Sequence, residues 1–428
     1  MKIAIATLGS RGDVQPFVAH RSGKIGVGLQ KAGHEVSICT SYSFKGSIVN
    51  YGLRYAYMND EFVKFMATDA GLLAIAIASN PIAWMKKAME LSAKLALSQR
   101  QMLSEQWAEM QEAEAIVYHP KAIGGYHIAE KLGVPGYLCL PFPCYVPTAA
   151  FANPIFPDWK LGGWYNKLTY KIVPWMSFTY GDLVNSWRSE SLQLPPTRYP
   201  VGNLVKTNGK PVPVMHCYSP LVVPRPDDWG EGAIATGYWF LEPPADWQPP
   251  EELIEFLAGG EAPVYVGFGS MAGRDTQKST KLVLEALAKC GQRGIIAKGW
   301  GGLEAYELPK NIIQVEAVHH SWLFPQVAAV VHHGGAGTTA AGLRAGKPTV
   351  ICPFFGDQPF WGKRIYELKV GAKPIRQKVL TADKLAAAIN EVVSDELMGK
   401  RARTLGEKIQ AEDGVGRAVD FIERQSRS

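Results

Sequence analysis

Patterns typical of short buried strands alternate with helical patterns along two separate stretches of this 428-residue chain. In the first stretch, Lys2 to Leu8 and Glu35 to Thr40 are predicted strands, and a glycine-containing loop and a helical pattern lie between them. The pattern returns at Ala115 to Tyr118 and Gly136 to Leu140. Strands and helices that alternate in this way form a parallel sheet with helices on both faces. The first stretch is therefore predicted to be a doubly wound α/β domain.

A second series of the same kind begins after a segment rich in Pro, Gly and Asp, which we interpret as an interdomain linker. Its strands are predicted at residues 263–267, 294–297, 312–315, 327–331 and 349–352. A chain of this length is also too long for one ordinary hydrophobic core. We expect an N-terminal domain of residues 1–221, a linker of residues 222–250 and a second domain of residues 251–405.

Composition and charge are those of a globular protein. Apolar residues make up 47% of the chain, which is enough for a core in each domain. The net charge of +6 is spread along the chain, so a small anionic ligand or a membrane surface is favoured over nucleic acid. The six cysteines form no CxxC pair, which suggests reduced thiols in a cytoplasmic protein. No apolar run reaches the roughly 20 residues of a membrane span.

The most informative motif is HHGGAGTT, residues 332–339, which follows a predicted buried strand. A helix is predicted to begin at its small residues, so the first backbone N–H groups would point along the helix axis toward an anion. The glycines let a diphosphate approach the backbone, and His332 can donate to a phosphate oxygen, more strongly when protonated. The alternative is a tight turn with packing glycines and one satisfied histidine.

Other nucleotide-binding motifs are missing from the sequence. The loop after the first strand, Gly9 to Asp13, reads GSRGD instead of GxGxxG, and the second strand ends at Thr40 without the acidic residue that holds the ribose of NAD. No GxxxxGK[ST] loop for ATP or GTP occurs. No DxD motif occurs either, and the adjacent acids Asp227 and Asp228 lie in the predicted linker. We expect neither a nicotinamide cofactor nor a metal ion.

Residues 330–358, VVHHGGAGTTAAGLRAGKPTVICPFFGDQ, resemble the donor signature of inverting UDP-sugar glycosyltransferases, and their motifs are most similar to those of the sterol glucosyltransferase branch. The similarity extends over nearly the whole chain, through LGSRGDVQPF (8–17), LGGWYNKLTYKIV (161–173), VYVGFGSM (264–271) and KGWGG (298–302). It implies the GT-B fold, in which two Rossmann-like domains face each other across a cleft. It also implies that a C-terminal helix, residues 406–428, crosses back to the N-terminal domain.

The resemblance implies that the second domain binds the UDP-sugar. The Ser270 hydroxyl would bond the distal phosphate, Trp300 would lie near the uracil ring, and the backbone of Val318 would read the edge of the base. Asp357 and Gln358 would hold sugar hydroxyls, a task that suits a carboxylate and an amide; the alternative for Asp357 is a turn or helix-cap residue. The expected donor-binding residues are Gly269, Ser270, Trp300, Val318, His332, Gly335, Ala336, Gly337, Thr338, Asp357 and Gln358.

Asp13 stands where other branches of the superfamily carry a catalytic histidine. A carboxylate there can take the proton of the acceptor hydroxyl; alternatively, it caps the first helix. His20 is a rival base, whereas His119 and Lys121 either line the cleft or have a structural role. The acceptor pocket is expected in the aromatic-rich segment after residue 141 and the helices between residues 62 and 110. Its predicted members are Phe142, Tyr145, Trp164 and Trp175.

The resulting hypothesis is an inverting transfer of glucose from UDP-glucose to the hydroxyl of a sterol or a similar bulky apolar acceptor. Alternatives are glycosylation of a macrolide-type or glycopeptide-type aglycone from a UDP- or dTDP-sugar, a UDP-sugar epimerase, and a sugar-nucleotide-binding module without activity. Four basic residues beside apolar ones could rest on an anionic membrane surface or form a solvated helix face. They are Lys86, Lys87, Lys94 and Arg100.

Overall fold

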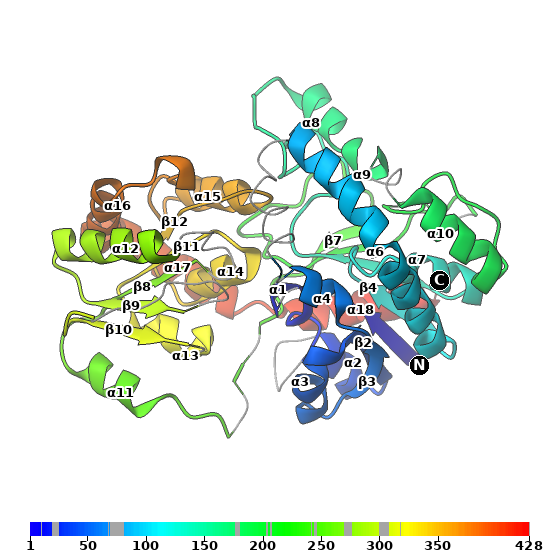
Figure 1. Cartoon of the computed structure of the whole chain (residues 1–428), viewed down its shortest axis with the longest axis horizontal. Coiled ribbons are helices and arrows are strands. Elements are labelled where there is room, and N and C mark those ends of the chain that lie inside the picture. Colours follow the sequence, from blue (N-terminus) through cyan, green and yellow to red (C-terminus); the bar gives the residue numbers. More distant parts are fainter. Residues whose placement is uncertain are drawn as a thin grey trace. The chain divides into compact units, whose positions relative to one another are not determined.

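The computed structural model describes residues 1–9, 11–18, 25–66, 68, 81–175, 180–202, 204–205, 208–240, 242–243, 246–268, 276–298, 308–316 and 318–427. The chain divides into two compact units (Figure 1). Unit 1 comprises Met1–Leu241 and Asp413–Ser428, and unit 2 comprises Glu242–Glu412. The domain limits predicted from the sequence, at residues 221, 250 and 405, stay a prediction.

Unit 1 contains a parallel sheet with the order β3-β2-β1-β4-β5-β6-β7 among its described residues. The strands are β1 (Lys2–Ala6), β2 (Glu35–Ser41), β3 (Arg54–Met58), β4 (Ala115–Tyr118), β5 (Gly136–Leu140), β6 (Val214–His216) and β7 (Ala233–Ala235). The strand order reverses between β1 and β4, and ligands of doubly wound sheets bind at the carboxyl ends of the strands at such a point. Ala6 pairs with Tyr118, so these two carboxyl ends lie side by side.

The helices of unit 1 are α1 (Arg11–Val14), α2 (Ile25–Lys31), α3 (Lys45–Asn50), α4 (Glu61–Met66), α6 (Pro81–Met110), α7 (Gly124–Leu132), α8 (Gly163–Thr169), α9 (Ile172–Trp175), α10 (Gly181–Trp187) and α18 (Gly414–Arg427). The last of these, α18, follows unit 2 in sequence and packs against α2. A β-carbon at Gly28 would lie 2.3 Å from Val415 Cγ1, so this close packing requires glycine. The Trp239 indole also donates to the Gly414 carbonyl at 3.2 Å.

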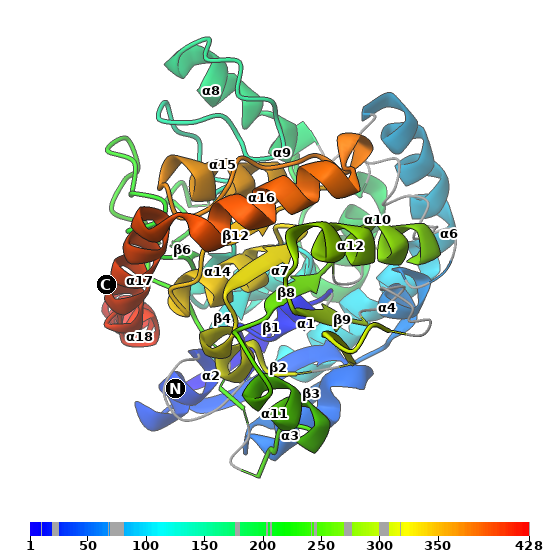
Figure 2. The ribbon, with the colours of Figure 1, turned by 90° about the vertical axis from the view of Figure 1, so that its left-hand side faces the viewer.

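Unit 2 contains a parallel sheet with the order β10-β9-β8-β11-β12 in its described part. The strands are β8 (Val264–Gly267), β9 (Gly294–Ala297), β10 (Ile312–Val315), β11 (Ala329–His332) and β12 (Thr349–Ile351). The helices are α11 (Glu251–Ala258), α12 (Thr276–Cys290), α13 (His320–Leu323), α14 (Ala336–Arg344), α15 (Gln358–Glu367), α16 (Ala382–Ser394) and α17 (Glu396–Gln410). Figure 2 shows α12 and α16 on one side of this sheet and α11 on the other.

These two sheets confirm the predicted α/β class with two doubly wound halves. Strand residues such as Ile3, Ile5, Val330 and Val331 are completely or almost completely buried, as expected for parallel strands with helices on both faces. No helix in the described ranges is both long and apolar enough to span a bilayer.

Candidate functional site

Asp13 lies at the carboxyl edge of the unit 1 sheet, inside the short helix α1 that follows β1. The Thr7 hydroxyl donates to the Asp13 carbonyl at 2.9 Å and ties the end of the strand to the helix. Gly9 has a φ of +134°, and a β-carbon there would lie only 2.3 Å from Asp13 Oδ2. Glycine at position 9 therefore allows both the turn and the position of the carboxylate.

Two residues of the loop after β4 converge on this carboxylate. Lys121 Nζ donates to Asp13 Oδ2 at 2.7 Å, and His119 Nε2 lies 3.8 Å from Asp13 Oδ1. The Asp13 side chain is only 15% exposed, so solvent screens the ion pair less than it would on an open surface. The structure thus joins Asp13 to His119 and Lys121, which the sequence left between a functional and a structural role.

His119 is a neutral member of this cluster. Burial lowers its pKa to about 4, and the positive charge of Lys121 acts in the same direction while Asp13 opposes both. Its Nδ1 accepts a hydrogen bond from the Lys121 backbone N–H at 3.3 Å, so the neutral ring carries its proton on Nε2. That N–H is on the nitrogen nearer Asp13. The cluster combines a carboxylate, an ammonium group and a neutral imidazole donor.

In unit 2, the HHGGAGTT motif forms the connection from β11 to α14, at the carboxyl edge of the sheet. Gly334 has a φ of +95°, and Gly335 occupies the N-cap position of α14 without a side chain to cap it. The first N–H groups of α14, from Ala336, Gly337 and Thr338, have no acceptors within the helix. Together with the helix dipole, they form a region that favours an anion.

His332 ends β11 and is completely buried. Burial, followed by the neighbouring His333 and His320, holds its pKa well below the ordinary range, so the ring is neutral. Its Nδ1 accepts from the Gly334 N–H at 2.9 Å, which leaves the proton on Nε2. This Nε2 atom has no hydrogen-bond partner among the residues that the structure describes. An unsatisfied buried donor costs about 1–3 kcal/mol, which an anionic acceptor would recover.

Asp357 and Gln358 lie at the start of α15, next along the same edge. Asp357 occupies the N-cap position, but its side chain does not cap the helix, and Oδ2 instead accepts from the Trp361 indole at 2.8 Å. Gln358 is buried, and its Oε1 accepts from the Phe354 N–H at 2.8 Å. Both side chains therefore hold the loop in place. The amide NH₂ is the part of the Gln358 side chain that can donate to a ligand.

Val318 lies half-buried just before α13, beside an aromatic cluster that the sequence did not single out. The Trp247 ring meets the His319 ring edge to face at 5.0 Å and the Trp322 ring at 5.7 Å. The HHSW sequence at residues 319–322 was the sequence feature that could have indicated this aromatic cluster, but Trp247 lies far away along the chain. The predicted donor residues Gly269, Ser270 and Trp300, and the rival base His20, lie outside the described residues.

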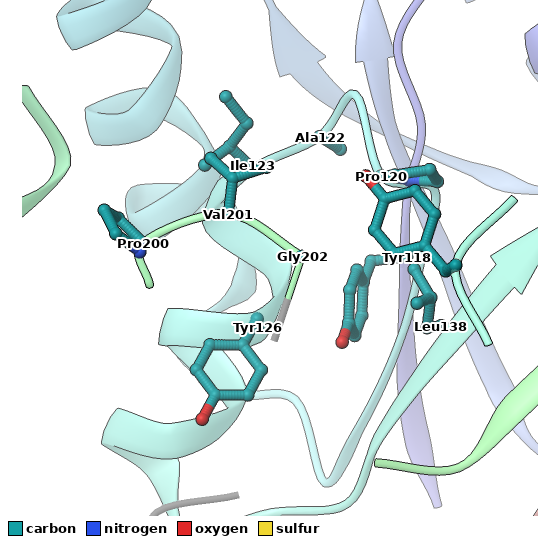
Figure 3. A pocket seen from close by; sticks show the side chains of 10 residues that line it. Tyr118, Pro120, Ala122, Ile123, Tyr126, Leu138, Pro200, Val201 and Gly202 are labelled. Carbon is teal, nitrogen blue, oxygen red and sulfur yellow. The ribbon is translucent and has the colours of Figure 1, made fainter. Parts of the chain in front are cut away.

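One of the four predicted acceptor residues lines a pocket in the described part of unit 1. Tyr145 lines a narrow pocket of about 20 Å³. Its other walls include Tyr118, Ile123 and Leu138 (Figure 3). Phe142 is half-buried outside the lining of this pocket, and Trp164 is 66% exposed. The fourth residue, Trp175, ends α9, and its side chain lies outside the described part.

The pocket and the Asp13 cluster are formed in part by consecutive residues of the chain. Tyr118 and Pro120 line it, and His119 stands between them in the sequence. The Tyr118 hydroxyl is buried and has no hydrogen-bond partner among the described residues. The other lining residues are largely apolar, and the pocket has room for about one water-sized group.

Two family models match this chain. The glycosyltransferase family 28 N-terminal domain matches residues 3–150. The erythromycin biosynthesis protein CIII-like C-terminal domain matches residues 281–415. The first match contains Asp13, His119 and Lys121, and the second contains the β11–α14 connection.

Similarity along 98–99% of this chain is found to proteins named sterol 3-beta-glucosyltransferase. Two are from Arabidopsis thaliana: one is 37% identical over 426 residues, 98% of this chain and 64% of that protein, and the other is 38% identical over 434 residues, 99% of this chain and 68% of that protein. A third, from Glomerella lagenarium, is 37% identical over 441 residues, 99% of this chain and 28% of that protein. The chain thus spans about two thirds of the plant relatives and less than a third of the fungal one.

Solved structures support the fold. The glycotransferase of kitacinnamycin matches with a TM-score of 0.69 at 20% identity and covers 99% of both chains. The calicheamicin glycosyltransferase matches with a TM-score of 0.66 at 17% identity and covers 99% of this chain and 98% of that one. The predicted GT-B fold class is thereby confirmed. With the full-length relatives, it follows that this chain belongs to the sterol glucosyltransferase branch of the UDP-glycosyltransferases.

Proposed function

We propose that this chain transfers glucose from UDP-glucose to the hydroxyl of a sterol, with inversion at the anomeric carbon. The observation that supports the proposal most directly is 37–38% identity to proteins named sterol 3-beta-glucosyltransferase along 98–99% of the chain. The similarity includes both the Asp13 cluster and the β11–α14 connection. Each of them has a distinct part in the proposed reaction.

Unit 2 would hold the donor. The diphosphate of UDP would accept hydrogen bonds from the first N–H groups of α14 and from His332 Nε2, the buried donor without a described partner. When the bond from the sugar to UDP breaks, negative charge grows on the distal phosphate. Donors already fixed in place stabilise that charge without reorganisation, and this is commonly the largest contribution to catalysis.

Unit 1 would activate the acceptor. The sterol hydroxyl would give its proton to Asp13 as its oxygen attacks the anomeric carbon from the face opposite UDP. Lys121 engages Oδ2, so we assign the proton to Oδ1, the oxygen that faces His119. Lys121 and His119 act in this scheme as positioning residues, because they hold the carboxylate and do not themselves touch the reacting atoms.

The test is a product analysis by mass spectrometry with UDP-glucose or dTDP-glucose as donor. The acceptor panel contains sterols, macrolide aglycones and a glycopeptide core. The proposal expects a hexose adduct on a sterol from UDP-glucose, with the β linkage established by NMR. An adduct confined to an aglycone would support the alternative acceptor class. Conversion of UDP-glucose to another UDP-hexose without any acceptor would show an epimerase, and binding without turnover would show a binding module.

A further inference from the structure

A cluster of large apolar side chains is exposed around α8 in unit 1. Within residues 155–168, five such side chains are 46–66% exposed. We call them the α8 patch: Ile155, Trp159, Leu161, Trp164 and Leu168. Single exposed apolar residues are normal on protein surfaces, but five of them within 14 residues, two of them tryptophans, indicate an interaction site.

The α8 patch stands on a well-anchored base. Gly163 approaches Ala149 so closely that a β-carbon there would lie 2.8 Å from Ala149 Cβ. The Asn166 amide donates to the Ala149 carbonyl at 2.7 Å, and the Asn153 N–H donates to the Thr169 hydroxyl at 2.8 Å. Buried polar bonds of this kind fix the helix, so the outward side chains are presented in one arrangement and do not belong to a loose loop.

The aromatic rings of the α8 patch are also held in place. Tyr165 is buried, and its hydroxyl donates to the Pro157 carbonyl at 2.7 Å. Trp159 stacks on the Tyr165 ring at 5.5 Å, and Trp164 meets the same ring edge to face at 6.2 Å. The two exposed indoles therefore flank one anchored tyrosine.

Lysines accompany the apolar side chains on the outward face. Trp164, Lys167, Leu168 and Lys171 are all exposed and follow the i, i+3, i+4, i+7 spacing of one helical face, although α8 itself ends at Thr169. Residues 155–171 contain three lysines and one aspartate, which gives this segment a net charge of +2. Lys160 pairs with Asp158 at 3.1 Å and Lys167 with Asp228 at 3.2 Å, whereas Lys171 carries no ion pair to any described residue.

We infer that the α8 patch docks onto the surface of a lipid bilayer that contains anionic lipid. Tryptophan is the side chain that best suits the headgroup region, because its ring is apolar and its N–H can still meet water or lipid oxygens. Lys171, which carries no ion pair to any described residue, complements negative headgroups, and its long stem can lie along the apolar surface. The inference does not depend on the proposed function, since the bilayer needs no sterol to bind this surface.

Vesicle sedimentation tests the inference. The full chain is mixed with sterol-free vesicles of phosphatidylcholine, with or without phosphatidylserine. Wild type is expected to bind the vesicles with phosphatidylserine more tightly than the vesicles of phosphatidylcholine alone. The double change Trp159→Ser/Trp164→Ser should weaken binding about tenfold or more, because burial of a large apolar side chain contributes at least that much. Lys171→Gln should weaken binding to phosphatidylserine vesicles about fivefold and leave phosphatidylcholine binding unchanged.

Two further variants keep the test decisive. Leu161→Ser/Leu168→Ser removes apolar surface without touching the Trp159–Tyr165 stack, so it tests docking even when the tryptophan variant is unstable. Leu397→Ser is the matched control, since Leu397 is 66% exposed in unit 2 and should be indifferent to vesicles. The inference is overturned when wild type does not bind vesicles, or when both α8 variants bind as wild type does. It is equally overturned when light scattering shows a dimer that the α8 variants dissociate.

Discussion

The carboxyl edges of the two sheets differ in charge. In unit 1, that edge holds an ion pair, with Asp13 and Lys121 at 2.7 Å and a neutral His119 beside them. In unit 2, the β11–α14 edge is made of backbone N–H groups, glycines and His332, whose pKa is so low that the ring stays uncharged. The first edge is built from side chains that lie 108 residues apart, and the second from consecutive residues.

This difference matches two separate chemical tasks. Removal of a proton requires a group that changes its protonation state, and a carboxylate can do so. Stabilisation of a leaving diphosphate requires donors that stay as they are, and backbone N–H groups with a neutral imidazole meet that requirement. The comparison therefore supports our proposal that unit 1 carries out proton transfer and unit 2 binds the anion. Each assignment can be tested by one substitution.

The largest effect is expected for Asp13→Asn. The amide cannot take a proton from the acceptor, so turnover should fall by about 10²–10⁴-fold, the usual contribution of a positioned base. Asn is nearly isosteric and can still accept a hydrogen bond from Lys121, so folding should be preserved. Affinity for UDP, measured by calorimetry, should stay the same, because unit 2 is assigned to the diphosphate.

His20→Ala is the companion variant, since His20 is the rival base in the sequence. Near wild-type turnover for Asp13→Asn, together with loss of turnover for His20→Ala, would move the base to His20. A loss of UDP affinity in Asp13→Asn would instead break the division of tasks between the two edges.

A smaller but measurable effect is expected for His332→Ala. Hydrogen bonds to charged groups contribute about 1.5–3 kcal/mol, so UDP affinity should fall by roughly 10- to 150-fold. Uridine, which lacks phosphates, is the matched ligand, and its affinity should hardly change. Calorimetry with both ligands measures the difference. An equal loss for UDP and uridine would mean that His332 supports the loop only, for instance through its bond to the Gly334 N–H.

The same contrast explains what the sequence could and could not predict. The β11–α14 connection is continuous in sequence, and each of its features follows from local rules: a strand, glycines for a tight turn and a helix start. The sequence therefore predicted the strand end, the turn and the helix start that the structure shows here. The partners of Asp13 come from the loop after β4, and no local spacing indicates that the Lys121 ammonium group meets the carboxylate.

The direction in which a side chain points is the other feature that the sequence could not predict. The motif PFFGDQ predicts that Asp357 and Gln358 hold sugar hydroxyls, and this stays a prediction; local packing adds the bonds in which Asp357 accepts from Trp361 and Gln358 accepts from Phe354. The place of Trp164 in an acceptor pocket stays a prediction, and the structure shows this side chain 66% exposed. Composition shows that apolar surface exists in a segment, whereas packing decides whether that surface faces a cavity or the solvent.

A substitution of His119 tests whether this residue is a neutral donor at the carboxyl edge of the unit 1 sheet. Its pKa of about 4 in the fold lies below the ordinary 6.5, so the unfolded chain takes up a proton first as the pH falls. Stability should decrease from about pH 6.5 downward and this contribution should level off near pH 4. His119→Gln should reduce the loss between pH 6.5 and pH 5 by up to about 2 kcal/mol. Urea unfolding at both pH values measures this, and an unchanged loss would mean that His119 is charged in the fold.

The smallest effect is expected for removal of metal ions. This experiment tests whether the β11–α14 connection of unit 2 can bind a diphosphate without a cation. The N-terminus of a helix carries the equivalent of about half a positive charge, and α14 presents it together with free N–H groups. The Nε2–H of His332 adds a buried donor that has no partner among the described residues. UDP affinity in EDTA should therefore equal the affinity in Mg²⁺. Loss of binding on chelation, restored by Mg²⁺ alone, would show that a cation carries the charge that we assign to α14 and His332.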